Sequence, residues 1–112
     1  MKKDPKIYLE HIQEAIRAIL EFTNDVTEEK FYQSDLLQSA VIRKFEIMGE
    51  AAKRLPKKLR DKNPDIPWKQ MAGFRDILIH DYDDLNLEII WETIRTDLPS
   101  ILPLIDDLTE RN

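Results

Sequence analysis

The sequence of 112 residues contains no cysteine and only two glycines. Without cysteine the chain can form neither disulfide bonds nor thiolate metal sites, and a reducing cytoplasm is the compartment that suits it. Two glycines leave little material for tight hairpins or for a glycine-rich loop that would hold a phosphate. These absences count against disulfide-stabilised scaffolds and against nucleotide-binding folds of the glycine-rich type.

Long apolar runs are also missing. No stretch approaches the ~20 apolar residues that span a bilayer, and the basic start at residues 1–5 lacks the apolar segment of a signal peptide. We therefore expect a soluble, cytoplasmic protein with no membrane contact. The 22 acidic residues outnumber the 17 basic ones, for a net charge of −5, which counts against broad electrostatic binding of nucleic acid.

What the sequence does have is helical periodicity. Apolar residues recur at spacings of three and four, with helix-forming composition and no strand-like alternation. This pattern predicts helices over residues 5–22, from Thr27 or Ser34 to 55, 57–63, from 65 into the seventies, 87–94 and 98–108. Asp65 is the predicted N-cap of the fourth of these. We therefore predict an all-α fold, a single domain over residues 1–112 built as an antiparallel bundle of about five helices.

The predicted helix that ends at residue 55 is apolar on two faces, so it should lie between other helices. Gly49 in its interior costs up to ~1 kcal/mol relative to alanine, which predicts close approach of a neighbouring backbone near Ala51 and Ala52.

A polar seam runs along the same helix, formed by Arg43, Glu46, Glu50 and Arg54. It is open to two interpretations. These residues form surface pairs worth ~0.2–0.5 kcal/mol each, or Glu50 orients a reactive residue on a neighbouring helix.

A basic run follows, in which six cations share ten residues with one acid, Asp61. Such a run is usually a solvated face. The functional interpretation is a weak RNA-binding surface, for which the candidates are Lys53, Arg54, Lys57 and Lys58. The histidine at position 11 has no second ligand at metal-binding spacing, and we assign it no function.

The most reactive side chains lie together in residues 75–82. In a regular helix Arg75 falls on the apolar stripe of Met71, and Tyr82 returns to the same face. His80 shares that face only if the helix ends near residue 79. The polar residues 81–84, and Asn86 as an N-cap, predict such an end. The alternative to a reactive site is a structural role for each residue. Arg75 would extend its charged end to solvent, His80 would complement a helix dipole, and Tyr82 would be a half-buried anchor.

The pattern of Arg75, four residues, His80, one residue and Tyr82 resembles the signature of HepT-like toxins of the HEPN superfamily. Asp76 occupies a polar position where such proteins often carry asparagine. Two further segments, residues 47–52 and 65–68, resemble the Ile-Gly-Glu-Ala segment and the Pro-Trp helix entry of the same family.

This resemblance implies a homodimeric, metal-independent RNase with a composite cleft between protomers. It implies Arg75 and His80 as the catalytic pair, with Asp76 as an orienting group. It also implies a type II toxin–antitoxin pair, in which a small nucleotidyltransferase antitoxin adenylylates Tyr82. We expect no cofactor.

The chemistry of the residues agrees with this. The sequence offers no set of metal ligands and no serine or cysteine nucleophile beside a base. Metal-free RNA cleavage needs a base for the 2′-hydroxyl, an acid for the departing 5′-oxygen and a cation for the phosphate, and two copies of the motif in a homodimer would supply them. Two alternatives stay open: a non-catalytic nucleotide-binding or substrate-binding subunit of a small nucleotidyltransferase, and a helical dimerisation module.

Overall fold

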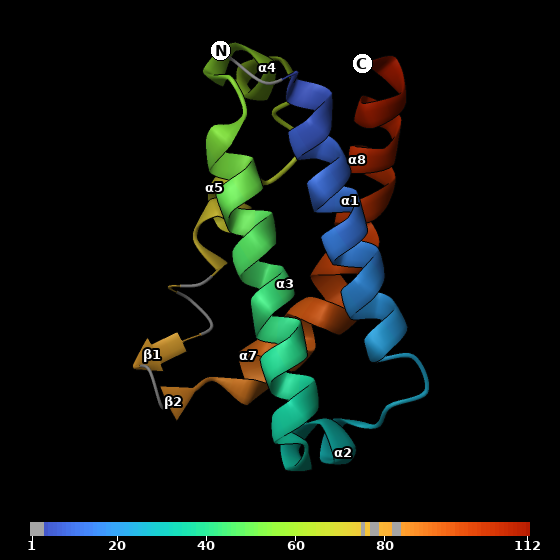
Figure 1. The fold of residues 1–112 in the computed structure, drawn as a ribbon, viewed down its shortest axis with the longest axis vertical. Helices are drawn as coiled ribbons and strands as arrows, with labels where there is room; N and C mark the ends of the chain where they lie inside the picture. The colour runs from blue at the N-terminus through green and yellow to red at the C-terminus, as the bar shows by residue number, and fades with distance from the viewer. Residues whose placement is uncertain (1–3, 75, 77–78, 82–83) are drawn as a thin grey trace.

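Three long helices form the frame of the structure, a computed structural model that describes residues 4–74, 76, 79–81 and 84–112. They are α1 (Pro5–Phe22), α3 (Asp35–Arg54) and α8 (Leu98–Arg111). Helix α1 packs against both of the others and runs in the opposite direction to them, so that the two ends of the chain lie at one end of the bundle (Figure 1). The predicted antiparallel helical bundle is confirmed.

Shorter helices connect the long ones: α2 (Glu28–Gln33), α4 (Lys57–Lys62), α5 (Trp68–Ala72) and α7 (Leu87–Glu92). Both predicted helix starts are used, because Thr27 caps α2 and Ser34 caps α3. Each side-chain oxygen accepts a hydrogen bond of 3.1 Å from a backbone N–H three residues on.

The two predicted C-terminal helices are one continuous helix. Helix α7 passes into a π-helical turn, η1 (Thr93–Asp97), which passes into α8. Pro99 lies in the first turn of α8 and has no N–H to donate to the carbonyl four residues earlier, which favours a wider turn at this point. The chain also changes direction here (Figure 1).

Two short strands form in the segment where the end of a helix and a polar connection were predicted. Strand β1 (Ile79–Asp81) pairs antiparallel with β2 (Asp84–Leu85), and this hairpin projects from one side of the bundle (Figure 1). The fold class remains all-α as predicted, and this small hairpin is a local addition that the sequence analysis did not predict, because strands this short carry no alternating pattern. The predicted end of the helix before residue 79 is confirmed, as is Asn86, whose Oδ1 caps α7 at 3.3 Å from the N–H of Ile89.

The core lies between α1, α3 and α8 and includes the buried aromatic residues of the shorter helices. Helix α3 buries one apolar face, with Val41, Phe45 and Met48 at 0–1% exposure. The opposite face was predicted to be covered as well. On that face Ala51 is 4% exposed, Ile47 is half-buried and Leu36 is 83% exposed, so the predicted cover is found only toward the C-terminal end of α3.

Helices α3 and α5 cross closely at Gly49, as predicted. A Cβ atom at this position would lie 3.1 Å from the carbonyl oxygen of Met71 and 3.5 Å from that of Ala72. The start of α5 differs from the prediction, because Asp65 does not cap it. The indole N–H of Trp68 instead donates to the carbonyl of Asn63 at 3.0 Å and holds the turn before the helix.

Side chains tie the remaining elements together. Arg17 on α1 donates two hydrogen bonds of 2.8 Å to Asp106 on α8. Arg95 stacks on the Trp91 ring at 4.3 Å and donates to the carbonyls of Thr23 and Val26, which fixes the loop between α1 and α2 against η1. Among the described helices, none is long and apolar enough to cross a membrane.

We predict that Gly49→Ala lowers the free energy of unfolding by about 1 kcal/mol, because overpacking against a carbonyl exceeds the ~1 kcal/mol gain in helix propensity. Gly73→Ala is the matched control: the φ of −96° at Gly73 suits any residue, and a Cβ there would lie 3.4 Å from the carbonyl oxygen of Lys69. The control should be neutral or stabilising by about 0.4–1 kcal/mol. Urea unfolding monitored by circular dichroism measures both, and a Gly49→Ala protein more stable than wild type would contradict the close crossing.

Candidate functional site

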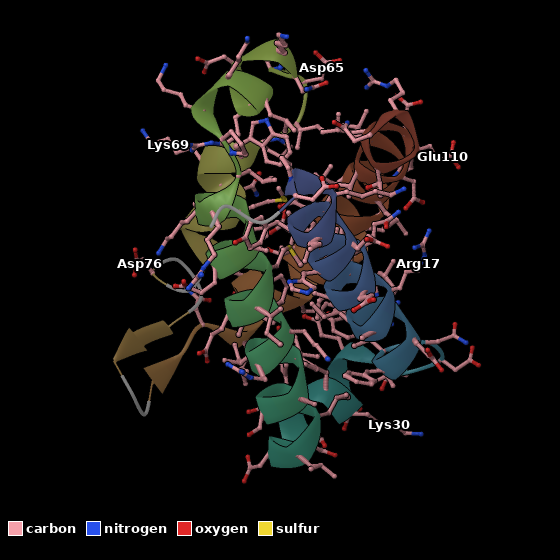
Figure 2. The ribbon with its side chains drawn as sticks, turned by 45° about the horizontal axis from the view of Figure 1, so that its top comes forward. Arg17, Lys30, Asp65, Lys69, Asp76 and Glu110 are labelled. Atoms are coloured by element: carbon pink, nitrogen blue, oxygen red, sulfur yellow. The ribbon has the colours of Figure 1, made fainter. Side chains whose placement is uncertain are left out.

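The predicted reactive residues fall on the part of the chain that follows α5 and includes the hairpin. Arg75 and Tyr82 lie outside the described residues. The backbone of His80 lies in the middle of β1, and the structure does not describe its side chain. Asp76 is described and exposed, and it lies on the side of α3 away from α8 (Figure 2). Helix α5 ends at Ala72, and the chain is helical again at Phe74 and Asp76, so the predicted placement of Arg75 on the face of Met71 stays a prediction.

Buried aromatic residues fix the start of this segment. Phe74 is 1% exposed and packs edge-on against Phe45 of α3, with ring centroids 5.1 Å apart. Met71 is fully buried one turn earlier. On α5, Gln70 donates a 2.8 Å hydrogen bond to Asp97 of η1. The chain therefore leaves the core at residue 74 from a fixed point on α3.

A polar groove of about 400 Å³ begins beside this point. It is lined by side chains of α1 and α3 and by the chain after α5, namely Tyr8, His11, Arg43, Phe45, Glu46, Ile47, Gly49, Glu50, Ala51, Lys53, Arg54, Ala72 and Asp76. Four of the predicted site residues, Glu50, Lys53, Arg54 and Asp76, thus border one groove, although they come from two separate segments.

The groove carries both signs of charge. Its cations are Arg43, Lys53 and Arg54, and its carboxylates are Glu46, Glu50 and Asp76. Lys53 and Glu50 form an exposed pair at 4.0 Å, a contact of little energetic weight. Within the described part of the chain the guanidinium groups of the two arginines form no ion pair, so they are available to an anionic ligand.

The rest of the basic run lies elsewhere. Lys57 and Lys58 belong to α4 and do not line the groove. The ammonium group of Lys57 pairs with Asp61 at 2.8 Å, and Lys58 borders a separate depression near the ends of the chain. The structure therefore divides the predicted RNA-binding residues into two in the groove and two outside it.

Tyr8, His11 and Arg43 line the groove although they were not among the predicted site residues. Tyr8 and His11 face each other edge-on from α1, with ring centroids 6.3 Å apart and planes at 81°. Arg43 was noted only as part of a polar seam. The i,i+3 spacing of the two rings was visible in the sequence, but only the packing of α1 against α3 shows that they share a groove with Arg43.

Tyr32 is the clearest electrostatic outlier away from the groove. Its hydroxyl donates to the Glu28 carboxylate at 2.7 Å, and this hydrogen bond raises the pKa of Tyr32 to about 12. The pair spans one turn of α2 on the surface, where it stabilises a short helix. Among the described residues, no group of three histidine, aspartate or glutamate side chains stands close enough to hold a metal ion.

Comparison with known proteins gives the family. The family described as "Ribonuclease HepT-like" matches residues 12–108, which include the groove segment of α3 and the whole of the predicted motif. No solved structure matched the chain.

Individual relatives agree with this family assignment. The chain is 48% identical over 112 residues to a Methanocaldococcus jannaschii protein named "Gamma-glutamylcyclotransferase and putative RNase". It spans only half the length of that relative. It is 39% identical to "Putative RNase" of Caldanaerobacter subterraneus subsp. tengcongensis, with 97% of each chain covered. It is 45% identical to "Probable ribonuclease HepT" of Thermococcus cleftensis, with 90% of this chain and 92% of the relative covered. The chain belongs to the HepT-like ribonuclease family.

Proposed function

We propose that this protein is a metal-independent endoribonuclease whose reaction is carried out by Arg75 and His80. The observation that carries the proposal is the family match over residues 12–108, which spans the Arg-x4-His-x-Tyr motif. The groove supports it, because Asp76 from the motif segment lies beside cations that could receive RNA. We place this activity in the cytoplasm.

The proposed reaction needs no metal. A base removes the proton of the ribose 2′-hydroxyl, the 2′-oxygen attacks phosphorus, and the bond to the 5′-oxygen breaks as an acid supplies that oxygen with a proton. His80 is the proton-transfer group, and Arg75 binds the phosphate on which charge accumulates. Asp76 and Glu50, which border the same groove, orient these groups.

The base and the acid are required together, and one histidine does not perform both tasks at once. A homodimer with the two motif segments at its interface supplies two histidines and two arginines. Two features support this assembly: Leu36 is 83% exposed on a half-covered apolar face of α3, and the hairpin that carries His80 projects from the bundle (Figure 1).

The proposed control of this activity is covalent. A small nucleotidyltransferase acts as the antitoxin of a type II toxin–antitoxin pair and adenylylates Tyr82. The added group brings a negative charge that competes with RNA phosphate for Arg75, and its bulk fills space that the substrate requires.

One observation favours a second candidate function. The groove holds as many carboxylates as arginines and lysines, and the whole chain has a net charge of −5. A non-catalytic subunit that binds a nucleotide for a nucleotidyltransferase would need less positive charge than an RNase. RNA cleavage by the purified protein in EDTA separates the two functions, since only the RNase produces fragments there.

We predict that His80→Ala abolishes RNA cleavage in EDTA and leaves the fold intact. A proton-transfer group contributes about 10²–10⁴-fold to the rate, so the residual cleavage should fall below one hundredth of wild type. Arg75→Ala should give a similar loss. Gel analysis of a labelled RNA measures the cleavage and far-ultraviolet circular dichroism checks the fold. Cleavage by His80→Ala at the wild-type rate would remove this residue from the mechanism.

We predict a homodimer at micromolar concentration, measured by sedimentation velocity. Because the site is composite, specific activity should fall on dilution in parallel with the dimer fraction. A monomer that keeps full specific activity would contradict both the assembly and the need for two histidines.

We predict that co-expression with the proposed nucleotidyltransferase antitoxin adds adenylyl groups to this protein and silences its cleavage. Intact-mass spectrometry measures the addition, and Tyr82→Phe is the control that lacks the acceptor hydroxyl. Additions of the same mass to Tyr82→Phe, or modified protein that cuts RNA at the unmodified rate, would contradict the proposed control.

A further inference from the structure

The groove between α1 and α3 has the size and position of a substrate subsite. Its volume of about 400 Å³ is within the range of ~300–1,000 Å³ typical of small-ligand sites. Asp76 borders the groove, and its neighbour along the chain is Arg75 of the motif. A strand of nucleic acid lying in the groove would therefore pass directly to the motif segment.

Two arginines can hold the backbone of such a strand. Arg43 and Arg54 are eleven residues apart on α3, which is about 16 Å along a helix and close to a whole number of turns. Both therefore lie on one side of α3, and both line the groove with exposed side chains. At this separation they would contact different phosphate groups, each through a planar guanidinium that suits bidentate binding.

The rings of α1 supply a surface for a base. His11 is exposed and Tyr8 is half-buried, and their planes meet at 81°. In an edge-on pair, the ring that supplies the edge keeps both of its faces clear of its partner. Single-stranded RNA is recognised largely by the stacking of its unpaired bases on such rings.

The carboxylates of the groove favour single-stranded over double-stranded RNA. Glu46 and Glu50 lie on α3 between the two arginines and would repel a phosphate placed beside them. A carboxylate instead accepts hydrogen bonds from the amino groups of exposed base edges. A duplex presents mainly its phosphates and riboses to a surface of this kind, whereas a single strand can turn its bases toward the carboxylates.

We propose that this groove binds a single-stranded RNA segment next to the bond that is cut, with phosphates on Arg43 and Arg54 and a base on the Tyr8–His11 pair. This inference rests on the proposed ribonuclease function. It assigns a role to His11, to which the sequence analysis assigned no function. It also locates the RNA contact at Arg54 and its neighbours in the groove rather than at Lys57 and Lys58.

The test measures binding without cleavage. A fluorescein-labelled 2′-O-methyl RNA of eight nucleotides cannot be cut by attack of its 2′-oxygen, and its fluorescence anisotropy reports binding to the full chain. We expect Arg43→Ala/Arg54→Ala to weaken binding by about tenfold or more. The control Lys30→Ala/Lys69→Ala removes the same charge from exposed residues outside the groove and should weaken binding by about twofold or less. Equal losses in the two double variants would overturn the proposal.

A second pair of variants tests stacking. His11→Ala should weaken binding by about fivefold, since one base–ring stack is worth roughly that factor or more, and His11→Phe should restore it because phenylalanine keeps a ring. A duplex of the same sequence should compete poorly. Failure of His11→Phe to bind better than His11→Ala, or equal competition by the duplex, would overturn the subsite.

The outcomes separate this inference from the proposed function. If the wild-type protein binds the oligonucleotide through the groove but cuts no RNA in EDTA, the subsite stands and the catalytic proposal fails. If it cuts RNA and the groove variants bind the oligonucleotide as wild type does, the subsite fails and the catalytic proposal stands.

Discussion

The candidate site depends on one close approach of two backbones, that of Gly49 on α3 to the carbonyl groups of Met71 and Ala72 on α5. A short helix of five residues has little stability of its own, so α5 is held by its contacts. This close approach lets Phe74 pack against Phe45. The chain that follows Phe74 therefore starts from a fixed point on the surface of α3. Any residue larger than glycine at position 49 would move that point, and the motif segment with it.

The same crossing accounts for the groove. Phe45 turns into the core against Phe74, whereas the polar seam of α3 that begins at Arg43 faces outward. Because α1 packs against α3, the Tyr8–His11 pair stands opposite this seam. The groove is therefore the space that remains where two long helices and one short helix meet, and its polar lining follows from the seam.

Much of the helical fold could be predicted from the sequence, because caps and prolines are local signals. Thr27, Ser34 and Asn86 cap helices as predicted, and the predicted close crossing at Gly49 was found. The predicted cap at Asp65 was wrong, because a tertiary contact, from the Trp68 indole to the carbonyl of Asn63, fixes that turn instead.

The hairpin and the groove could not be predicted. Strand pairing over so few residues is a matter of backbone hydrogen bonds and leaves no hydrophobic period to detect. The groove joins residues of α1 and α3 that are more than thirty positions apart, and only the packing of these helices brings His11 to Arg43. Among the predicted site residues, Glu50, Lys53, Arg54 and Asp76 were brought together, whereas the roles of Arg75, His80 and Tyr82 rest on the motif.

In the proposed mode of binding, the mixed charge of the groove lets an acidic protein act on RNA. Each phosphate neutralised on a single strand contributes a slope of about −0.7 to the dependence of log affinity on log salt concentration, so two arginines give a shallow dependence. The remaining surface, with its net negative charge, repels nucleic acid that does not enter the groove. Affinity must then come largely from stacking and from base edges, which only an unpaired strand offers. Local composition rather than total charge therefore determines which nucleic acid reaches the motif.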